Sequence, residues 1–187
     1  FCYTRPVTVH TVGHSTHSLE EFVALLDAHG IASVADVRRW PASRRHPQFA
    51  RAALADALVR AGRRYAWLPE LGGRRGARPD SRHVAWRSAG FRGYADHTET
   101  EEFAAGLARL LDIAAEGPTA ILCAEAVPWR CHRQLIADAL LVRGVDVIHL
   151  LGPAATRRHA LSPTARVEGG RLVYDRGQPG SPRLDRT

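Results

Sequence analysis

Apolar residues recur along the chain in two alternating kinds of segment. Short apolar runs at 7–12, 31–37, 64–68, 119–122 and 145–151 have the length and composition of strands. Apolar residues at helical spacing lie between them: from Ser18 to Gly30, over 49–61, from Thr98 to Gly117, and over 131–143. Since strands that alternate with helices form parallel sheets covered on both faces, the pattern predicts an α/β fold with a mostly parallel, doubly wound sheet of about five strands.

Residues that favour helix ends and turns support these boundaries. Ser18–Glu21 and Thr98–Glu101 both have the capping-box pattern, in which a hydroxyl and a glutamate satisfy free N–H groups at a helix start. Gly169 and Gly170 separate two short apolar runs, which predicts a small C-terminal hairpin.

The sequence predicts a single domain over 1–187, because it contains no internal repeat and no linker. We expect a core over about 7–152 and a tail that carries the hairpin over 153–187. The segment 69–97 is rich in Gly and Arg and has no regular period, so it is predicted to be a long functional loop that closes as a lid.

Composition narrows the choice of partners. The net charge is +7, and all 26 basic residues are arginine. This charge favours an anionic partner such as nucleic acid, a nucleotide or a phosphorylated metabolite. Because abundant Arg and Ala are also typical of a GC-rich coding bias, the positions of the arginines are stronger evidence than their number.

The same composition sets expectations about compartment. No apolar run approaches the roughly 20 residues that span a bilayer, so no membrane partner is expected. Three cysteines do not form a disulfide framework, which favours a reduced, cytoplasmic protein. A chain that starts at Phe1 and contains no methionine is expected to be processed, trimmed or a fragment.

Polar and glycine residues follow the predicted strands where parallel strands would end together. They are Gly13, His14 and Ser15 after the first strand, Asp36, Arg38, Arg44 and Arg45 after the second, Gly72 and Gly73 after the third, and Cys123 and Glu125 after the fourth. In open parallel sheets ligands bind beyond the carboxyl ends of the strands. We therefore expect a functional cleft at this edge.

The segment CAEAVPWRCHR, from Cys123 to Arg133, concentrates reactive groups between a strand and a helix. Cys131 and His132 open the predicted helix, whose N-terminal field and adjacent arginines favour a thiolate. Other interpretations stay open: buried small residues, a disulfide between the cysteines, or a zinc or iron site of Cys123, Cys131, His132 and His14. A phosphatase loop needs C-x5-R, and the spacing from Cys123 to Arg130 is one residue too long.

The remaining candidates also have two interpretations each. Asp36 and Glu125 are acid/base groups or partners in ion pairs, and His14 is a base, a ligand or a loop histidine. A set of arginines forms either an anion clamp or a solvated basic face: Arg38, Arg44, Arg45, Arg74 and Arg75. Base stacking or ordinary packing explains Trp40, Trp67, Trp86, Phe91 and Tyr94.

Five motifs in order, TVGHSTHSLEEFVALLDAHGI, VADVRRWPASRRHPQF, YAWLPELGGRR, FRGYADH and CAEAVPWRCHRQLIADAL, resemble the bacterial and archaeal family called domain of unknown function 488. The resemblance runs from about Val7 to Leu150 and into the tail. Signature positions carried over from it are Gly13–Ser15, Asp36–Arg38, Arg44, Arg45, Pro47, Phe49, Leu71–Gly73, Tyr94, Cys123, Glu125 and Cys131–Arg133. The family has no settled activity, so the resemblance implies the fold and the location of the site alone.

The leading hypothesis is an enzyme that acts on an anionic, nucleotide- or nucleic-acid-derived substrate. Cys131 or Cys123 supplies the thiol, Glu125 or Asp36 moves protons, and His14 and His132 assist. The groups expected to bind the anion are Gly13, Ser15, Arg38, Arg44, Arg45, Gly72, Gly73, Arg92, Tyr94 and Arg133. The alternatives are a nucleic-acid-binding module without catalysis and a zinc or iron protein that uses the Cys/His cluster.

Overall fold

The computed structural model describes residues 7–42 and 44–175; Phe1, Cys2 and the last part of the predicted tail, 176–187, lie outside these ranges. The strands are β1 (Thr8–Gly13), β2 (Ser33–Asp36), β3 (Arg64–Trp67), β4 (Thr119–Cys123), β5 (Asp146–Gly152), β6 (Ala155–Arg158), β7 (Ala165–Glu168) and β8 (Arg171–Tyr174). The helices are α1 (Leu19–Ala28), α2 (Arg51–Arg60), α3 (Ala89–His97), α4 (Glu101–Ala115) and α5 (Arg133–Leu141), with 3₁₀ turns η1 (Pro47–Phe49), η2 (Pro69–Leu71) and η3 (Pro128–Arg130).

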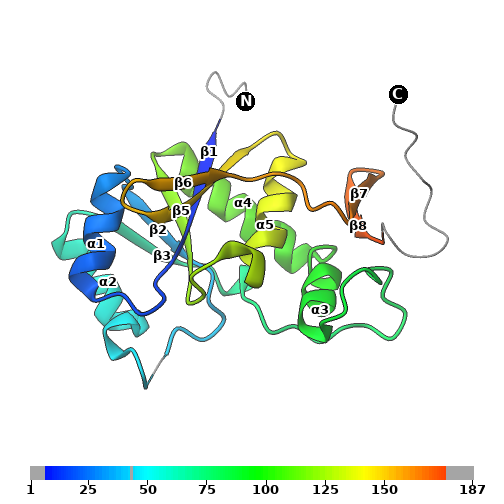
Figure 1. Ribbon diagram of the computed structural model, residues 1–187, viewed down its shortest axis with the longest axis horizontal. Coiled ribbons are helices and arrows are strands. Elements are labelled where there is room, and N and C mark those ends of the chain that lie inside the picture. Colours follow the sequence, from blue (N-terminus) through cyan, green and yellow to red (C-terminus); the bar gives the residue numbers. More distant parts are fainter. Residues whose placement is uncertain (1–6, 43, 176–187) are drawn as a thin grey trace.

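The main sheet has the strand order β3-β2-β4-β1-β5-β6, and its first five strands are parallel (Figure 1). This confirms the predicted α/β fold. A sixth strand, β6, adds an antiparallel edge to β5. The prediction of about five strands missed β6 because all four of its residues are exposed, so no apolar alternation marks it.

Alternate side chains of each parallel strand enter two separate cores, one on each face of the sheet. Val12, Val34 and Leu122 pack with residues of α1 and α2. Val9 and Ile121 pack with residues of α4 and α5 on the opposite face. Because α1 follows β1 on one face and α5 follows β4 on the other, the chain leaves these neighbouring strands in opposite directions at their carboxyl ends. This is the position at which open α/β sheets bind ligands.

One of the two predicted capping boxes is present. Ser18 and Glu21 exchange hydrogen bonds at the start of α1, at 2.7 and 3.1 Å. The second prediction is wrong: Thr100 caps α4, and its hydroxyl accepts from the Phe103 N–H at 3.2 Å. Thr98 instead ends α3, since its N–H donates to the Tyr94 carbonyl.

The segment 69–97 is not a plain loop, because its last nine residues form α3. Gly93 of this helix is buried against the chain at 75–77, where an added Cβ would lie 2.3 Å from the Arg75 carbonyl oxygen. The predicted C-terminal hairpin is confirmed as β7–β8. Its turn residues Gly169 and Gly170 have φ values of 56° and 77°, the backbone that the Gly-Gly pair supplies.

No helix in the described ranges is both long and apolar enough to cross a membrane.

Candidate functional site

The turns that follow β1, β2 and β4 meet at the carboxyl edge of the sheet, as the order of elements predicts. The His14 N–H donates to the Cys123 carbonyl at 3.0 Å, and the Val37 N–H donates to the Leu122 carbonyl at 3.0 Å. The His132 Nε2–H donates to the Val37 carbonyl at 3.0 Å. The thiol segment, Gly13-His14 and the Asp36–Arg38 turn therefore share one edge.

Cys123, Cys131 and His132 form a compact group at this edge. Pro128 opens η3, which turns the chain back so that Cys131 lies just before α5. The His132 Nδ1 atom is 3.9 Å from the Cys123 sulfur and 3.6 Å from the Cys131 sulfur. Because Nε2 donates to Val37, Nδ1 is the ring nitrogen that faces both sulfurs. Both cysteines are free thiols, so the predicted alternative of a disulfide between them is not formed.

Glycine and tyrosine close the remaining sides of this group. A Cβ added at Gly73 would lie 2.9 Å from His132 Nδ1, so only glycine lets the backbone approach the imidazole this closely. The Tyr94 ring lies 4.9 Å from the His132 ring, and its hydroxyl donates to the Leu71 carbonyl at 2.6 Å. Gly72 approaches Arg39 in a similar way, because a Cβ added at Gly72 would lie 2.7 Å from the Arg39 Cβ.

Arg133 is buried beside the thiols, with 1% of its surface exposed. Its Nε–H donates to the Cys131 sulfur at 3.4 Å, and its terminal NH2 group donates to the Glu125 carbonyl. Within residues 7–42 and 44–175 no carboxylate pairs with it. Because a buried guanidinium needs a counter-charge, Cys131 is the group that can supply one, as a thiolate.

The two thiols differ in acidity. Burial alone would raise the pKa of Cys131, but the hydrogen bond from Cys123 and the charge and N–H groups of Arg133 outweigh burial and lower it to about 6. The pKa of Cys123 is raised to about 12, because its S–H donates to Cys131 and because it is buried. The two contacts therefore favour a thiolate at Cys131 and a protonated thiol at Cys123.

Arg38, a predicted member of the anion clamp, is buried in an ion pair with Asp36. Its guanidinium donates to both carboxylate oxygens of Asp36, at 2.8 and 2.6 Å, and to the Phe49 carbonyl at 2.8 Å. Asp36 also accepts from the Tyr65 hydroxyl at 2.7 Å. Both charged groups are buried and satisfied, which favours the ion-pair interpretation for Asp36 over acid/base chemistry.

His14 is buried next to this ion pair and is not one of the donors around the thiols. Its Nδ1–H donates to the Ser15 carbonyl at 3.1 Å, and its Nε2 faces Arg38 at 3.4 Å. Its ring stacks on Phe49 at 4.3 Å. Burial and the Arg38 charge lower the pKa of His14 to about 4. The imidazole is therefore neutral, and its Nε2 lone pair accepts a hydrogen bond from the Arg38 guanidinium.

The other candidates contribute backbone or lie on the surface. A Cβ at Gly13 would lie 1.9 Å from the Glu125 carbonyl oxygen, and Ser15 adopts a left-handed φ of 47°. The Glu125 side chain is exposed, and none of the described arginines holds it, contrary to expectation. Arg44 and Arg45 are exposed after β2. Arg92 lies on α3, where no described contact joins its guanidinium to the thiols.

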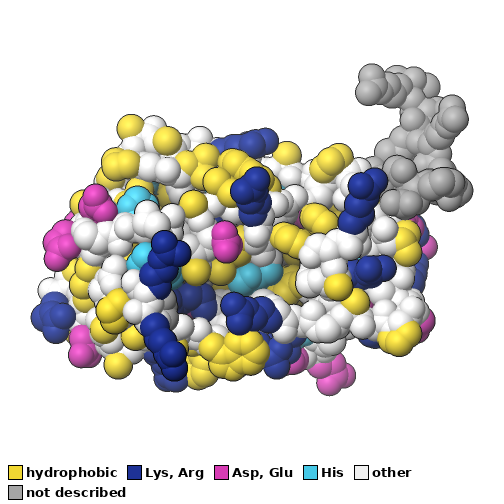
Figure 2. Space-filling model, turned by 60° about the horizontal axis from the view of Figure 1, so that its bottom comes forward, with side chains coloured by type: hydrophobic (Ala, Val, Ile, Leu, Met, Phe, Trp, Pro, Cys, Tyr) yellow, Lys and Arg dark blue, Asp and Glu magenta, His cyan; other side chains and the backbone are white. Residues whose placement is uncertain are grey.

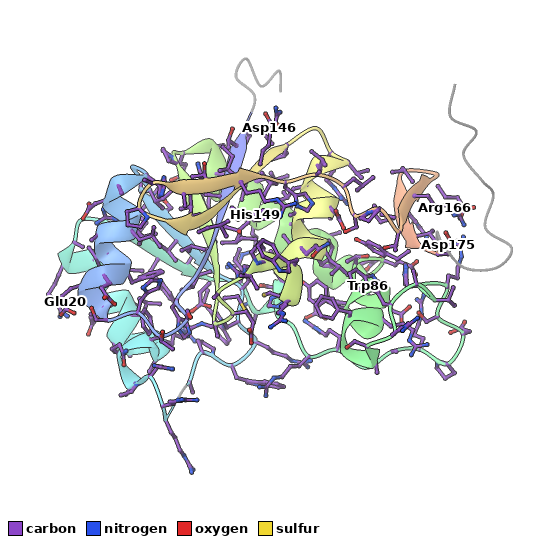
Figure 3. All side chains as sticks on the ribbon, in the orientation of Figure 1. Glu20, Trp86, Asp146, His149, Arg166 and Asp175 are labelled. Atoms are coloured by element: carbon purple, nitrogen blue, oxygen red, sulfur yellow. The ribbon has the colours of Figure 1, made fainter. Side chains whose placement is uncertain are left out.

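One buried network was not predicted. Figure 3 shows His149 inside the molecule beside α5, where its Nδ1 is 2.8 Å from the Thr11 hydroxyl. Its Nε2 is 3.0 Å from His159 Nδ1, and His159 Nε2 is 2.8 Å from Asp138 Oδ1. One feature of the sequence could have predicted this network. Asp138 lies among the apolar residues of the helix predicted over 131–143, and a buried carboxylate must accept hydrogen bonds from buried donors.

Three side chains have the donor set and spacing for a metal ion. The ligand atoms of Cys123, Cys131 and His132 lie within 4.8 Å of one another. Two sulfurs and one imidazole nitrogen suit zinc or iron, and a hydrogen bond such as the one from Nε2 to the Val37 carbonyl would orient the His132 ring toward a metal. His14, which was predicted as a possible fourth ligand, is not one of this group.

Comparison with known proteins identifies the family. No curated protein and no solved structure matches the chain. A family model described as "Domain of unknown function DUF488" matches residues 18–140, a range that includes β2, β4 and both thiols of the site. Because this match covers more than half of the 187 residues, the chain belongs to the DUF488 family, as its motifs predict.

Proposed function

We propose that the protein is an enzyme, a hydrolase or transferase, that uses the Cys131 thiolate as a nucleophile on an anionic, nucleotide- or nucleic-acid-derived substrate. The observation that carries this proposal is the buried Arg133 guanidinium, which donates to the Cys131 sulfur at 3.4 Å and forms no ion pair with a described carboxylate. A thiolate held ionised near neutral pH is the activated form of a cysteine nucleophile. Free thiols fit the reducing cytoplasm, where we propose this chemistry takes place.

The contacts assign a role to each member of the group. The Cys131 sulfur attacks the substrate and forms a bond to it, while the leaving group departs with its bonding electrons and takes a proton from water. The His132 Nδ1 atom lies 3.6 Å from the Cys131 sulfur and acts, in its unprotonated form, as the base that deprotonates the water or second substrate that later displaces the sulfur. Cys123 keeps its proton and donates to the thiolate.

Access to the sulfur needs a movement. Cys131 is 3% exposed, whereas Ala124, Glu125 and Ala126 in the preceding turn are exposed. A substrate atom reaches Cys131 when this turn shifts outward. We therefore expect slow but strongly pH-dependent modification of Cys131.

The test is the rate of alkylation by iodoacetamide as a function of pH, followed by intact-protein mass spectrometry in a Cys2→Ser, Cys123→Ser variant. Serine at position 123 keeps an O–H donor to the thiolate. We expect a midpoint near pH 6, where the pKa of Cys131 lies, against 9.0 for an unperturbed thiol. A midpoint at or above 9.0 would remove the thiolate from the mechanism.

Turnover is assayed with nucleoside phosphates and short oligonucleotides, with products identified by mass spectrometry. We expect Cys131→Ala to abolish product formation while Cys2→Ser, which removes the cysteine outside the group, leaves it unchanged. Full turnover by folded Cys131→Ala would contradict the proposal.

A second candidate is a zinc- or iron-binding protein, favoured by the His132 Nδ1 atom, which faces the two sulfurs at 3.6 and 3.9 Å. Equilibration with zinc followed by elemental analysis decides it. One zinc per chain, lost in His132→Gln and retained in His14→Gln, is the expected result for a metal protein, and absence of stoichiometric zinc or iron after anaerobic preparation excludes it.

A further inference from the structure

Two tryptophans are exposed at the carboxyl edge, beside the thiol group. Trp40 follows β2 and is 60% exposed, and Trp129 follows β4 and is 46% exposed. These strands are neighbours, with Asp36 paired to Leu122. An exposed indole ring leaves a large apolar surface in contact with water, which is unfavourable. Two such rings on adjacent turns therefore indicate a ligand with flat groups that stack on them.

Each exposed ring carries a guanidinium. The Arg39 Cζ lies 4.9 Å from the centre of the Trp40 ring, and the Arg157 Cζ lies 5.4 Å from that of Trp129. A guanidinium on one side of the indole ring holds the ring in place and leaves the rest of its surface free for a ligand. The result is an aromatic surface next to a positive charge at two places on the same edge.

The turns around the two tryptophans carry mostly positive charge. The turns 37–46, 72–76 and 124–132 contain a single carboxylate, that of Glu125. Exposed arginines in them are Arg44, Arg45, Arg74 and Arg130, and none forms an ion pair with a described carboxylate. Arg75 of these turns is half-buried and pairs with Glu102, and elsewhere several exposed arginines form ion pairs, as in Arg109–Glu70 and Arg158–Asp146. Figure 2 shows this side, with arginine side chains across its middle and most acidic side chains toward its ends.

We infer that this face binds single-stranded nucleic acid, with bases stacked on Trp40 and Trp129 and phosphates held by Arg44, Arg45, Arg74 and Arg130. The inference deepens the proposed function, on which it rests for the idea that the bound strand is the substrate. Stacking on a protein ring needs an unstacked base, so a single strand fits and a duplex does not. An acidic peptide would use the arginines but would leave the indole rings without flat partners.

The test is fluorescence anisotropy with labelled strands of about 10 nucleotides, a length typical of single-strand sites. DNA and RNA strands, the matching DNA duplex and a polyglutamate peptide are compared on the full chain. We expect at least one single strand to bind more tightly than the duplex and the peptide. Trp40→Ala and Trp129→Ala should each weaken that binding about tenfold, the effect of losing one stacked base.

A matched pair of charge variants tests the phosphate contacts. Arg44→Gln with Arg45→Gln should reduce the slope of log Kd against log salt by about 1.4, which is about 0.7 for each lost phosphate contact. Arg60→Gln with Arg171→Gln removes the same charge from exposed positions on α2 and β8 and should leave the slope unchanged.

Three results would overturn the inference: no binding of either strand, duplex binding as tight as single-strand binding, or unchanged affinity in both tryptophan variants. A polyglutamate peptide that binds as tightly as the strands would assign the face to an acidic protein instead. Iodoacetamide labelling of Cys131 needs no nucleic acid. A failure of binding therefore leaves the thiolate proposal standing, and a failure of the thiolate test leaves the binding result standing.

Discussion

At the scale of single residues, the site depends on two positions that have no side chain. Gly13 lets the turn after β1 pass under the Glu125 carbonyl, and Gly73 lets the chain after η2 touch His132. Neither contact involves a positive φ, so the requirement for glycine comes from space and not from backbone conformation. The thiol segment is held in place from both sides by these close approaches.

Gly13→Ala is therefore predicted to destabilise the protein. Its Cβ would lie 1.9 Å from a backbone oxygen, which cannot rotate away, so the two turns must separate. We expect a loss of about 1–3 kcal/mol or more in the free energy of unfolding, measured with urea. Gly76→Ala is the control, because its Cβ would meet nothing within 4 Å. Equal stability of the two variants would show that the turns do not pack as described.

Residue types at the site were predictable from the sequence, but the partner of each was not. The cysteines, His132 and Arg133 occur in one short segment, so their proximity follows from sequence alone. Arg38 and Arg44 look alike in the sequence, yet the first is 7% exposed in an ion pair with Asp36 and the second is on the surface. Burial decides between a structural and a binding arginine, and burial depends on packing from distant elements.

At the scale of elements, α5 connects the site to the C-terminal segment. Its Asp138 accepts hydrogen bonds from His159, from the Ser162 N–H and hydroxyl, and from the Tyr174 hydroxyl of β8. Asp138 is fully buried, so these donors replace water around the carboxylate. The hairpin is thus attached to the same helix that begins beside the thiols.

Asp138→Asn should loosen the hairpin. The amide nitrogen would face donors in place of an acceptor, and we expect a loss of about 3 kcal/mol in stability together with faster hydrogen exchange over 165–174. Asp146→Asn is the control, since its ion pair with Arg158 is on the surface, where water and salt screen it, and we expect no measurable loss of stability. Unchanged exchange in Asp138→Asn would mean that other contacts hold the hairpin.

Elements with a strong apolar period were predictable, and those fixed by tertiary contacts were not. The stripe of Phe103, Leu107 and Leu110 predicted α4. The sequence AGFRGYADH of α3 contains two glycines, which are poor helix formers, and the helix is stabilised by packing of Gly93 against the segment at 75–77. Local propensity therefore gives no signal for α3.

At the scale of the whole molecule, the strand order creates the site. β4 lies between β2 and β1, so the thiol turn is flanked by the Asp36–Arg38 turn and by Gly13-His14 (Figure 1). The order of elements predicted that the turns share an edge, because parallel crossovers bring strand ends together. It did not predict that β4 would be central, which depends on how the cores of the two faces pack.

The same architecture buries neutral histidines, and this makes stability depend on pH. Burial, followed by the charges of His159 and Arg133, lowers the pKa of His149 to about 4, and the pKa of His14 is lowered equally. Both groups have a pKa of 6.5 when unperturbed. Between pH 6.5 and 4 the unfolded chain binds protons that the folded chain does not, so stability falls as the pH falls through this window. Each group contributes on the order of 2–3 kcal/mol to this loss.

Cys131 acts in the same direction at higher pH. Its pKa is 9.0 when unperturbed and about 6 when folded, so stability rises as the pH increases from 6 to 9. We predict that the urea midpoint increases from pH 4.5 to 7.5 and again to pH 8.5 at constant ionic strength. Cys131→Ser should lose the increase above pH 6 and keep the one below it, because serine does not titrate there and the histidines are unchanged. A urea midpoint that is the same at pH 4.5 and 7.5 would show that these histidines are not buried in neutral form.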